Sequence, residues 1–467
     1  MRLRRFVNQP TAALAVATVA VYLLVVVGAT ASLADAAEAC SSWPFCAGSL
    51  TDPAVAVAVG HRLLAALAGI AVLGAVVVAF RTDTPRRVRA AGVIALVLYP
   101  TQIAFGAFLA MGLSSLPVPG LHLAVGLSIF ASLVVALAWQ LEAETGGADD
   151  PLSAEEVEPV STEEEPEESP TPLAERPLAA RLKLRAFAYF RLMKPRLMWL
   201  LSLVAAAAMA LAAGPALGVR TIVFTLGGGV LAIGASGTFN HVLERERDEK
   251  MSRTNDRPIV THQIPERNAV AFGLVLTVLS VVAFLQLNPL TAALGVTAIL
   301  FYSIIYTLLL KPNTVQNTVI GGAAGSLPAL IGWAAVTGRI DVAGFMLATV
   351  IFVWTPSHFY NLALAYKEDY ARGGFPMMPV VRGETTTRKH ILLWIGTTLA
   401  ATTVLIRLTP LGWIAAVTTT VLGTVFLWAA IRLHREQTEQ AAFRAFHASN
   451  AYLGTLLIAV VVDALAF

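Results

Sequence analysis

Long apolar runs separated by short polar segments dominate the chain. Each run has about 20 mostly apolar residues, the length that a helix needs to cross a bilayer. The runs are continuous and do not alternate between apolar and polar residues, so they predict helices and no strands. They lie near 12–33, 55–80, 90–112, 120–141, 197–214, 221–243, 269–287, 290–310, 314–335, 342–366, 389–408, 411–431 and 447–466. The pattern predicts an all-α polytopic membrane protein with a block of four helices followed by a block of nine.

The composition excludes the main non-membrane classes. Hydrophobic residues make up 57% of the 467 residues and charged residues only 13%, whereas a soluble domain carries about 25% charged residues. The high apolar content also excludes a disordered or collagen-like chain. With only two cysteines, the chain is not a disulfide-rich secreted scaffold.

An acidic segment separates the two blocks of apolar runs. Residues 142–175 hold thirteen Asp or Glu and no Lys or Arg, although the whole chain has a net charge of +3. The segment is rich in Pro, Glu, Ser and Thr, and such a chain buries too little surface to offset its ordering entropy. We therefore expect a four-helix membrane domain at 1–141, a disordered acidic cytoplasmic linker at 142–180 and a nine-helix domain at 181–467. A regulatory binding tail is the alternative interpretation of the linker.

The distribution of Lys and Arg predicts the orientation in the membrane. Cytoplasmic loops of membrane proteins are enriched in these residues. Here they gather at the N-terminus, after the second run, and in 176–196, 244–267, 367–389 and 432–444. The N-terminus is therefore expected in the cytoplasm and the C-terminus outside the cell membrane. The positive charge reports this topology, and no nucleic-acid partner is expected.

One loop of the second block carries a pattern typical of a metal site. Asn240, Glu244 and Asp248 are spaced at i, i+4 and i+8, so a helix would present all three on one face. Mg²⁺ prefers oxygen ligands and shares its shell with substrate phosphate. Arg253 and Arg257 follow as candidate phosphate ligands. The alternative is an ordinary solvated loop with a helical charge pattern.

A second loop on the same side of the membrane repeats this arrangement. Asp369 follows the end of an apolar run and precedes Gly and Pro residues, and Lys311 follows another run. Two acidic clusters on one side suggest a site that holds a diphosphate between metal centres, with the lysine as a further phosphate ligand.

In these residues the second block resembles a known family. It is similar to the UbiA-type intramembrane prenyltransferases, and within them to the protoheme IX farnesyltransferases, over about 185–467. The matching residues are Tyr189, Lys194, Pro195, Arg196, Asn240, Glu244, Asp248, Met251, Arg253, Thr254, Arg257, Pro258, Tyr306, Thr307, Lys311, Asn317, Ile320, Gly321, Gly322, Gly325, Pro328, Gly332, Trp333, Trp354, His358, Phe359, Asp369, Tyr370, Pro376 and Pro379. The family usually has Asp where Glu244 stands, and this departure puts the metal geometry in doubt more than the function.

The resemblance implies transfer of a farnesyl group from farnesyl diphosphate to a vinyl group of protoheme IX (heme B), with addition of water, to give heme O. Mg²⁺ on Asn240, Glu244, Asp248 and Asp369 would promote loss of diphosphate, because it neutralises the charge of the leaving group. The cations of Arg253, Arg257 and Lys311 would assist.

Aromatic residues are candidates for stabilising the allylic cation, since ring faces attract positive charge. Tyr306, Trp354 and Tyr370 are the candidates, and ordinary core packing is the alternative for each. His358 is a candidate for orienting heme or water, and a structural hydrogen-bond role is its alternative.

Two other functions fit part of the pattern. The first is prenylation of a quinone or another aromatic acceptor. The second is a membrane heme-delivery protein without enzymatic activity, in which the carboxylates are only loop charges.

The first block has its own candidate residues. Cys40 and Cys46 lie in a loop on the oxidising side of the membrane, where a disulfide is expected and free or redox-active thiols are the alternative. His61 and His122 lie near the same surface, as a pair of heme ligands would require. Arg62 is placed to pair with a heme propionate.

These features resemble the N-terminal four-helix half of heme A synthase, over about 10–140. The family has a functional Glu where this chain has Ala58, and the second four-helix half is absent. Oxidation of heme O to heme A by this chain alone is therefore not expected. Heme binding by His61 and His122 and a purely structural relic are both open, and heme A synthase is a candidate partner.

Overall fold

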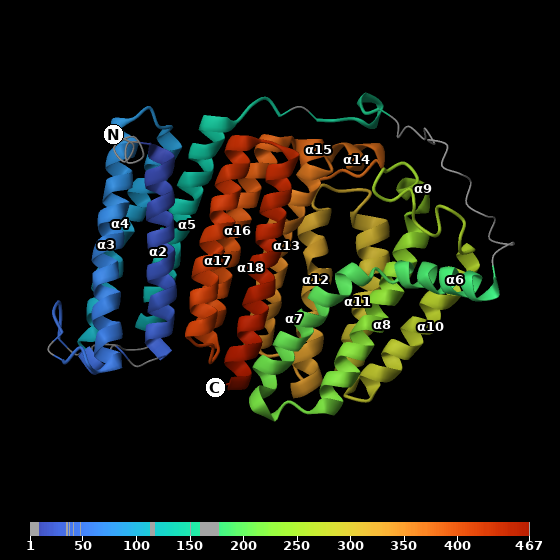
Figure 1. The fold of residues 1–467 in the computed structure, drawn as a ribbon. Helices are drawn as coiled ribbons and strands as arrows, with labels where there is room; N and C mark the ends of the chain where they lie inside the picture. Colours follow the sequence, from blue (N-terminus) through green and yellow to red (C-terminus); the bar gives the residue numbers. More distant parts are fainter. Residues whose placement is uncertain are drawn as a thin grey trace. The chain divides into compact units, whose positions relative to one another are not determined.

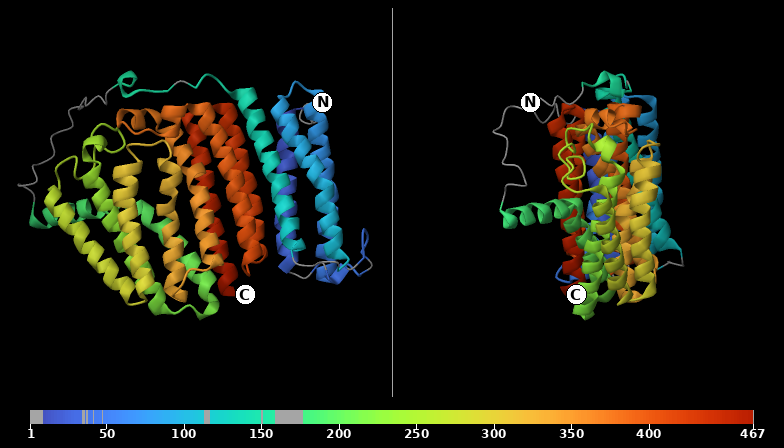
Figure 2. Two further views of the ribbon diagram at one scale, coloured as in Figure 1. Left: turned by 180° about the vertical axis from the view of Figure 1, so that it is seen from behind. Right: turned by 90° about the vertical axis from the view of Figure 1, so that its right-hand side faces the viewer.

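The computed structural model describes residues 9–33, 36, 38–40, 42–46, 48–112, 117–149, 151–158 and 177–466. Within these ranges 13 helices are long and apolar enough to cross a membrane, and no residue is in a strand. The all-α polytopic fold predicted from the apolar runs is confirmed. Figures 1 and 2 show these long helices and the connections between them.

The chain forms two compact units. Unit 1 contains residues 1–148 and 385–464, and unit 2 contains residues 149–384 and 465–467. The acidic linker was the expected boundary, whereas the contacts group the last three helices of the chain with the first four. The domain limits inferred from the sequence stay a prediction.

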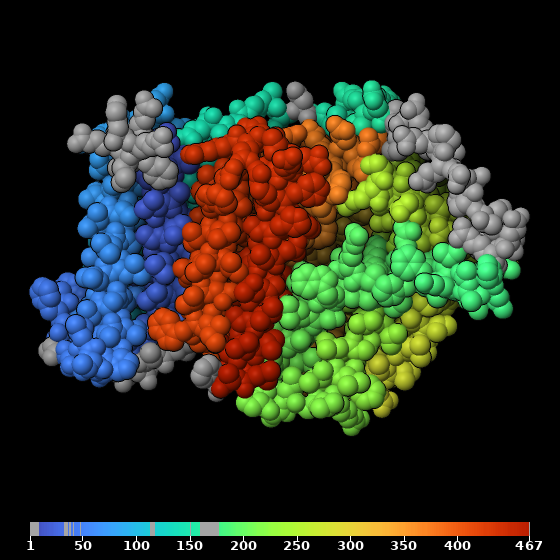
Figure 3. Space-filling view, in the orientation of Figure 1, coloured from blue at the N-terminus to red at the C-terminus, as the bar shows by residue number. Residues whose placement is uncertain are grey.

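Unit 1 brings together helices from both ends of the chain. On the face shown in Figure 3, α17 and α18 stand side by side as a continuous strip of packed side chains. The unit contains α2 (Pro10–Leu33), η1 (Glu38–Cys40), α3 (Pro53–Arg81), α4 (Arg86–Ala110), α5 (Val118–Thr145), α16 (Glu384–Leu408), α17 (Trp413–Glu436) and α18 (Glu439–Ala466).

A buried chain of hydroxyl groups joins four helices of unit 1. The Tyr22 hydroxyl of α2 lies 2.7 Å from Thr419 Oγ1 of α17. Thr419 Oγ1 is also 3.1 Å from the Tyr452 hydroxyl of α18, which lies 2.9 Å from Thr402 Oγ1 of α16. Because polar groups inside a bilayer need partners, this chain of hydrogen bonds specifies how α2 packs on the last three helices.

Ionic contacts and close packing strengthen unit 1 where α5 meets α16. The Glu142 carboxylate of α5 accepts a hydrogen bond of 2.7 Å from Arg87 of α4 and one of 2.6 Å from Lys389 of α16. Gly396 of α16 lies against Val134 of α5, where an added Cβ would come within 2.6 Å of a valine methyl group. The glycine therefore allows α5 and α16 to approach closely.

Unit 2 consists of the remaining helices, in the order of the chain. They are η2 (Ala154–Glu156), α6 (Leu178–Leu192), α7 (Pro195–Ala213), η4 (Gly214–Ala216), α8 (Val219–Leu243), α9 (Arg245–Asp248), α10 (Glu266–Leu285), α11 (Pro289–Leu300), η5 (Phe301–Leu310), α12 (Asn317–Thr337), α13 (Val342–Ala365), α14 (Lys367–Arg372) and α15 (Met378–Arg382). Helix α6 runs across the long helices of the unit and not along them (Figures 1 and 2). We call the end of unit 2 at which α8 ends and α12 begins its loop end.

The span that begins with α11 changes its helical pitch before it ends. Its last ten residues, η5, form a π-helix. The Lys311 N–H donates to the Tyr306 carbonyl at 2.8 Å, five residues back, and Thr307 Oγ1 donates to the Tyr302 carbonyl at the same distance. π-Helical segments occur frequently at functional sites, and this one holds two tyrosines and precedes a lysine of the candidate site.

Part of the predicted linker has a defined conformation. The Leu152 N–H donates to the Val380 carbonyl at 2.9 Å, and Val157 is buried against Met251 and Phe375. The expectation of disorder over 142–180 therefore differs from the structure at 151–158, because these few apolar side chains find a surface to cover. Residues 159–176, which include most of the glutamates, lie outside the described residues.

Loss of the central hydroxyl of the buried chain should destabilise unit 1. Thr419→Val keeps the shape of the side chain but leaves the Tyr22 hydroxyl buried without this partner, which costs about 1–3 kcal/mol. The midpoint of thermal unfolding of the detergent-solubilised protein should fall. In the control, Thr420→Val, the lost hydroxyl bonds only to Ala416 of its own helix at 2.8 Å, so a smaller change is expected. Equal midpoints for the two variants would contradict this role of Thr419.

Candidate active site

The three spaced oxygen ligands lie together at the loop end of unit 2. Asn240 is in the last turn of α8, Glu244 follows the helix, and Asp248 ends the short helix α9. Their exposed fractions are 1%, 3% and 0%. The helical spacing continues through the break, because the Glu244 N–H donates to the Asn240 carbonyl at 3.0 Å and the Asp248 N–H to the Glu244 carbonyl at 2.8 Å. This burial does not fit the alternative of an ordinary solvated loop.

Cations from other segments neutralise these buried groups. Lys311 Nζ, beyond η5, lies 2.6 Å from Glu244 Oε1. Arg257 lies 2.5 Å from Asp248 Oδ2 and 4.0 Å from Glu244 Oε2. Buried carboxylates require such partners, since an unpaired charge away from water is very costly.

Lys194, directly before α7, is a further cation of this cluster. Its ammonium group donates to Asn240 Oδ1 and to the Tyr302 hydroxyl, the latter at 3.3 Å. The Asn240 amide is fixed on its other side, because Nδ2 donates to Thr307 Oγ1 at 3.0 Å. Asn240 is thus held between α7 and the π-helical η5. Together Lys194, Asn240, Glu244, Asp248, Arg257 and Lys311 form what we call the polar cluster.

The pKa values of the polar cluster follow from burial and from these pairs. Burial raises the pKa of Asp248, and Arg257 only partly offsets this effect. For Glu244 burial acts in the same direction, but Lys311 and Lys194 outweigh it and the pKa lies below its usual value. Burial, followed by repulsion from Arg257, lowers the pKa of Lys194 to about 7. The cluster holds three basic groups (Lys194, Arg257 and Lys311) and two carboxylates, so a bound anion would balance its charge.

Asp369, the fourth predicted metal ligand, organises a neighbouring loop. One of its oxygens accepts hydrogen bonds from the Ser252 N–H at 3.1 Å, from Ser252 Oγ at 2.7 Å and from the Arg372 guanidinium. Its other oxygen accepts from the Arg253 N–H at 3.1 Å. Burial raises its pKa, but these donors outweigh burial and the pKa lies below its usual value. The structure thus shows Asp369 joining α14 to the loop that follows α9.

The aromatic side chains of the second loop hold cations of the site. The Arg253 guanidinium lies 5.3 Å from the centre of the Tyr370 ring and 3.2 Å from its hydroxyl. Lys311 Nζ lies 4.2 Å from the centre of the Phe375 ring. The rings of Tyr370 and Phe375 therefore help to position two cations that the sequence predicts as phosphate ligands.

An apolar pocket opens beside the polar cluster. Its empty space, including the part that is open to the surroundings, is about 700 Å³, and Lys194 and Tyr302 line it at the cluster. Its walls come from α7, α8, α11 and α12, and its other polar lining residues are Ser202, Thr225 and Ser236. Such a pocket fits a long hydrocarbon whose charged end lies at the polar cluster.

The remaining predicted aromatic residues lie outside the pocket lining. Tyr306 packs its ring 5.5 Å from that of Tyr302 and against Gly321 of α12. Trp354 and His358 of α13 are buried and stack on each other at 4.3 Å. None of these three is among the residues that line the pocket.

The donor set of the polar cluster fits Mg²⁺ that is shared with a substrate. Within the described ranges, no three His, Cys, Asp or Glu side chains come close enough together to hold a metal ion by themselves. However, Asp248 Oδ1 is buried and has no hydrogen-bond partner among the described residues. Mg²⁺ commonly uses one or two carboxylates and completes its shell with water and phosphate, which is what Glu244, Asp248 and the Asn240 amide offer.

The sequence pattern does not single out two residues of this site. Lys194 appears there only within a family motif, and no motif includes Tyr302. A lysine directly before the proline that starts a membrane helix was the one available signal for Lys194. No local signal distinguishes Tyr302, because the π-helical turn decides which tyrosine faces the pocket.

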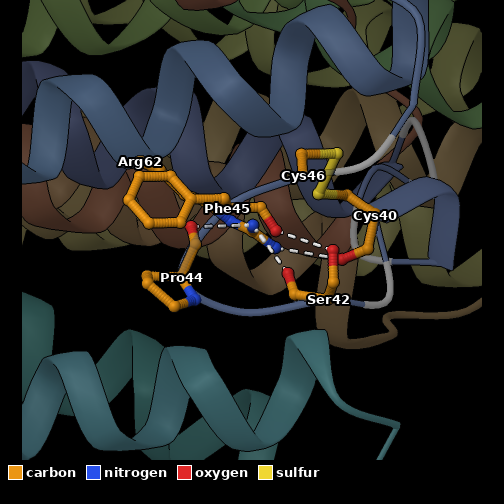
Figure 4. The surroundings of a disulfide bond; sticks show 6 residues. All are labelled: Cys40, Ser42, Pro44, Phe45, Cys46 and Arg62. Atoms are coloured by element: carbon orange, nitrogen blue, oxygen red, sulfur yellow. Dashed lines mark hydrogen bonds between the residues drawn. A yellow bond between two sulfur atoms is a disulfide. The ribbon is translucent and has the colours of Figure 1, made fainter.

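In unit 1, a disulfide loop covers the start of α3. Cys40 and Cys46 are joined by a disulfide with their Cα atoms 5.4 Å apart. The Arg62 guanidinium donates to the carbonyl groups of Cys40, Ser42 and Pro44 at 3.0, 2.8 and 3.2 Å (Figure 4). Arg62 therefore holds this loop, and its pairing with a heme propionate stays a prediction.

Two histidines of unit 1, His61 and His122, lie against glycines of neighbouring helices. An added Cβ at Gly28 of α2 would be 3.0 Å from His61 Cε1, and one at Gly106 of α4 would be 3.3 Å from His122 Cε1. The Nδ1 atom of each ring is buried without a hydrogen-bond partner among the described residues. His122 Nε2 lies 3.3 Å from the Gln102 amide nitrogen.

Comparisons with known proteins show the family to which the chain belongs. The model of the UbiA prenyltransferase family matches residues 200–454. A protoheme IX farnesyltransferase of Haloarcula marismortui is 62% identical over 461 residues, which cover 98% of this chain and 98% of that protein.

One solved structure shares the helical fold of part of this chain. A digeranylgeranylglyceryl phosphate synthase structure matches with a TM-score of 0.52 at 15% identity, covering 61% of this chain and 99% of that one. A UbiA homologue of Archaeoglobus fulgidus, described as bound to DMAPP and Mg²⁺, covers 59% of this chain and 99% of that chain, with 16% identity and a TM-score of 0.47.

Proposed function

Because the chain belongs to the UbiA prenyltransferase family, we propose that prenyl transfer takes place where the apolar pocket of unit 2 meets the polar cluster. The reaction of the chain is the farnesylation of protoheme IX, which gives heme O. Farnesyl diphosphate is the donor and protoheme IX the acceptor.

The observation that carries the assignment to this site is the position of Lys194. Lys194 lines the apolar pocket, and its ammonium group donates to Asn240 of the polar cluster. A prenyl diphosphate in the pocket would place its tail among apolar side chains and its diphosphate beside Lys194, Arg257 and Lys311. One substrate then satisfies both the apolar walls and the excess of buried positive charge.

Departure of diphosphate is the step that the polar cluster would assist. Heterolysis of the bond between farnesyl C1 and oxygen leaves both electrons on the diphosphate, whose growing charge must be neutralised. Mg²⁺ held by Asn240, Glu244 and Asp248 would supply part of that charge neutralisation when bound. Lys194, Arg257 and Lys311 would supply the rest through hydrogen bonds, and Asp369 would hold Arg253 and its loop in place.

The allylic cation formed in this way must meet the vinyl group before it meets water. The walls of the pocket exclude water around the prenyl chain, and the ring faces of Tyr302 and Tyr306 are near its mouth, where positive charge develops. The vinyl carbon adds to farnesyl C1, and water then adds to the resulting cation and loses a proton. We assign Trp354, His358 and Tyr370 to the acceptor side of the site, with His358 orienting heme or water.

The site is proposed to face the cytoplasm. The loops that hold the polar cluster contain most of the Lys and Arg of the second block, and such loops stay on the cytoplasmic side. This orientation puts the N-terminus in the cytoplasm and the C-terminus outside.

Membranes that contain the full chain should convert protoheme and farnesyl diphosphate to heme O. Turnover should stop when EDTA removes divalent cations and return when Mg²⁺ is added, since the carboxylates alone would repel the diphosphate. Heme extraction and mass spectrometry measure the product. Product only from a phenolic acid would favour the quinone alternative, and no product in any condition would favour heme delivery.

Removal of one carboxylate should separate the catalytic role from the structural one. Asp248→Asn should lower kcat by about 10²-fold or more, because it weakens the stabilisation of charge in the transition state. The control is Asp256→Asn, which changes an acid of the same loop whose side chain is 68% exposed and pairs with Arg191. Equal kcat values for the two purified variants would contradict the assignment of Asp248.

A second function is proposed for unit 1, namely binding of a heme by His61 and His122. The supporting observation is that each imidazole has a buried Nδ1 without a partner among the described residues, in a membrane-spanning helix where polar groups are costly. Neutral imidazoles are good iron ligands. If unit 1 were only a structural relic, nothing would compensate the cost of burying these imidazole nitrogens without partners.

Heme binding in unit 1 is testable in the full-length protein. Purified protein supplied with heme should show a low-spin bis-histidine spectrum, which His61→Ala and His122→Ala should each abolish. The control His447→Ala changes an exposed histidine of α18 and should keep the spectrum. A spectrum that survives both substitutions would show that these histidines do not bind the heme.

A further inference from the structure

The pocket of unit 2 has a defined depth. Lys194 and Gly237 mark its mouth, since an added Cβ on Gly237 would lie 3.2 Å from Lys194 Cγ. Ala205 of α7 and Thr225 of α8 mark its far end. Ala205 lies eleven positions after Lys194, and Thr225 lies twelve positions before Gly237. At 1.5 Å per helical residue the pocket is therefore about 17–18 Å deep.

Packed side chains and backbone close the far end. Ala205 meets α12 so closely that an added Cβ on Gly332 would collide with the Ala205 carbonyl oxygen. Phe284 is fully buried and fills the space between Gly228 of α8 and Gly295 of α11, where added Cβ atoms would come within 2.7 and 2.5 Å of its ring. The contact between Ala205 and Gly332 therefore closes the far end, and Phe284 closes the side of the pocket between α8 and α11.

This depth lies between the lengths of two prenyl chains. An extended chain advances about 1.2 Å per bond, so the roughly twelve main-chain bonds of a farnesyl group span about 14 Å. By the same measure a geranyl group spans about 10 Å and a geranylgeranyl group about 19 Å. The pocket therefore holds the first two in full, and the third exceeds its depth by about 1–2 Å.

Gly229 occupies the position where the third isoprene unit would pass. It lines the pocket and lies eight positions before Gly237, which places it about 12 Å below the mouth. An added Cβ at this position would meet no atom within 4 Å, so the wall here is open only because the residue has no side chain.

We propose that the closed far end of this pocket selects prenyl diphosphates by chain length, and that Gly229 is the residue that admits the third isoprene unit. This inference rests on the proposed function, because it takes the pocket as the site of the prenyl chain. Gly229 does not touch the reacting atoms, and it acts on specificity only.

Substitution of Gly229 should shift the substrate preference of the enzyme from farnesyl diphosphate toward geranyl diphosphate. In Gly229→Leu the new side chain takes up about the space of one isoprene unit. We expect kcat/KM for farnesyl diphosphate relative to geranyl diphosphate to fall about tenfold or more, because the third unit loses its buried surface. The mass of the prenylated heme reports which chain was transferred.

The matched control is Gly227→Leu on the same helix. Gly227 is exposed, does not line the pocket, and likewise has no atom within 4 Å of the place where a Cβ would stand. This variant should keep the ratio of the parent. Equal ratios for Gly229→Leu, Gly227→Leu and the parent would overturn the proposal.

A deeper pocket provides the opposite test and does not depend on the folding of Gly229→Leu. Ile331→Ala removes side-chain volume near the far end, and the use of geranylgeranyl diphosphate relative to farnesyl diphosphate should rise about fivefold or more. An unchanged ratio would contradict selection by depth. If the parent enzyme itself makes no product from farnesyl diphosphate, the proposed function fails, whereas activity without any shift in these ratios refutes the chain-length role alone.

Discussion

Burial of the Glu244 and Asp248 carboxylates at the end of a membrane helix is the constraint on which the architecture of unit 2 depends. Two charges that are almost fully removed from water are tolerated only with counter-charges close by. Lys311 and Arg257 supply them at 2.6 and 2.5 Å. Lys311 is 67 positions from Glu244 in the chain, so the end of η5 must come to the end of α8, and the loop after α9 must fold back to bring Arg257 to Asp248.

The same constraint supports the proposal that this site binds a highly charged substrate next to a bilayer. Every group of the polar cluster is already largely desolvated and held in position, so little reorganisation is needed when charge develops on a leaving diphosphate. The apolar pocket ends at Lys194, so the hydrocarbon and the charged end of one molecule find matching surroundings in adjoining parts of the site. In the proposed function, the hydrocarbon walls would keep water from the prenyl chain.

Unit 1 shows how a block from the N-terminus is joined to the last helices of the chain inside a membrane. Hydrophobic burial gives helices in lipid little reason to prefer one neighbour, so specific packing and hydrogen bonds decide. The Tyr22–Thr419–Tyr452 hydroxyl chain and the ion pairs of Glu142 provide that specificity between α2, α5 and the last three helices. Because these bonds involve both ends of the chain, the first four long helices pack directly with the last three and are not joined to them by the linker alone.

Length and composition determined the number and kind of helices, because a bilayer requires about 20 apolar residues per crossing and satisfies no backbone groups. The i, i+4, i+8 spacing of Asn240, Glu244 and Asp248 also determined that these side chains share a face, since helical geometry is local. Tertiary structure alone decided which cation meets which carboxylate, that Asp369 and Arg62 hold loops, and that the π-helical turn brings Tyr302 with Lys194 to the pocket. It also decided that the last three helices belong with the first four. These outcomes depend on contacts between residues far apart in the chain, for which a single sequence carries no distance information.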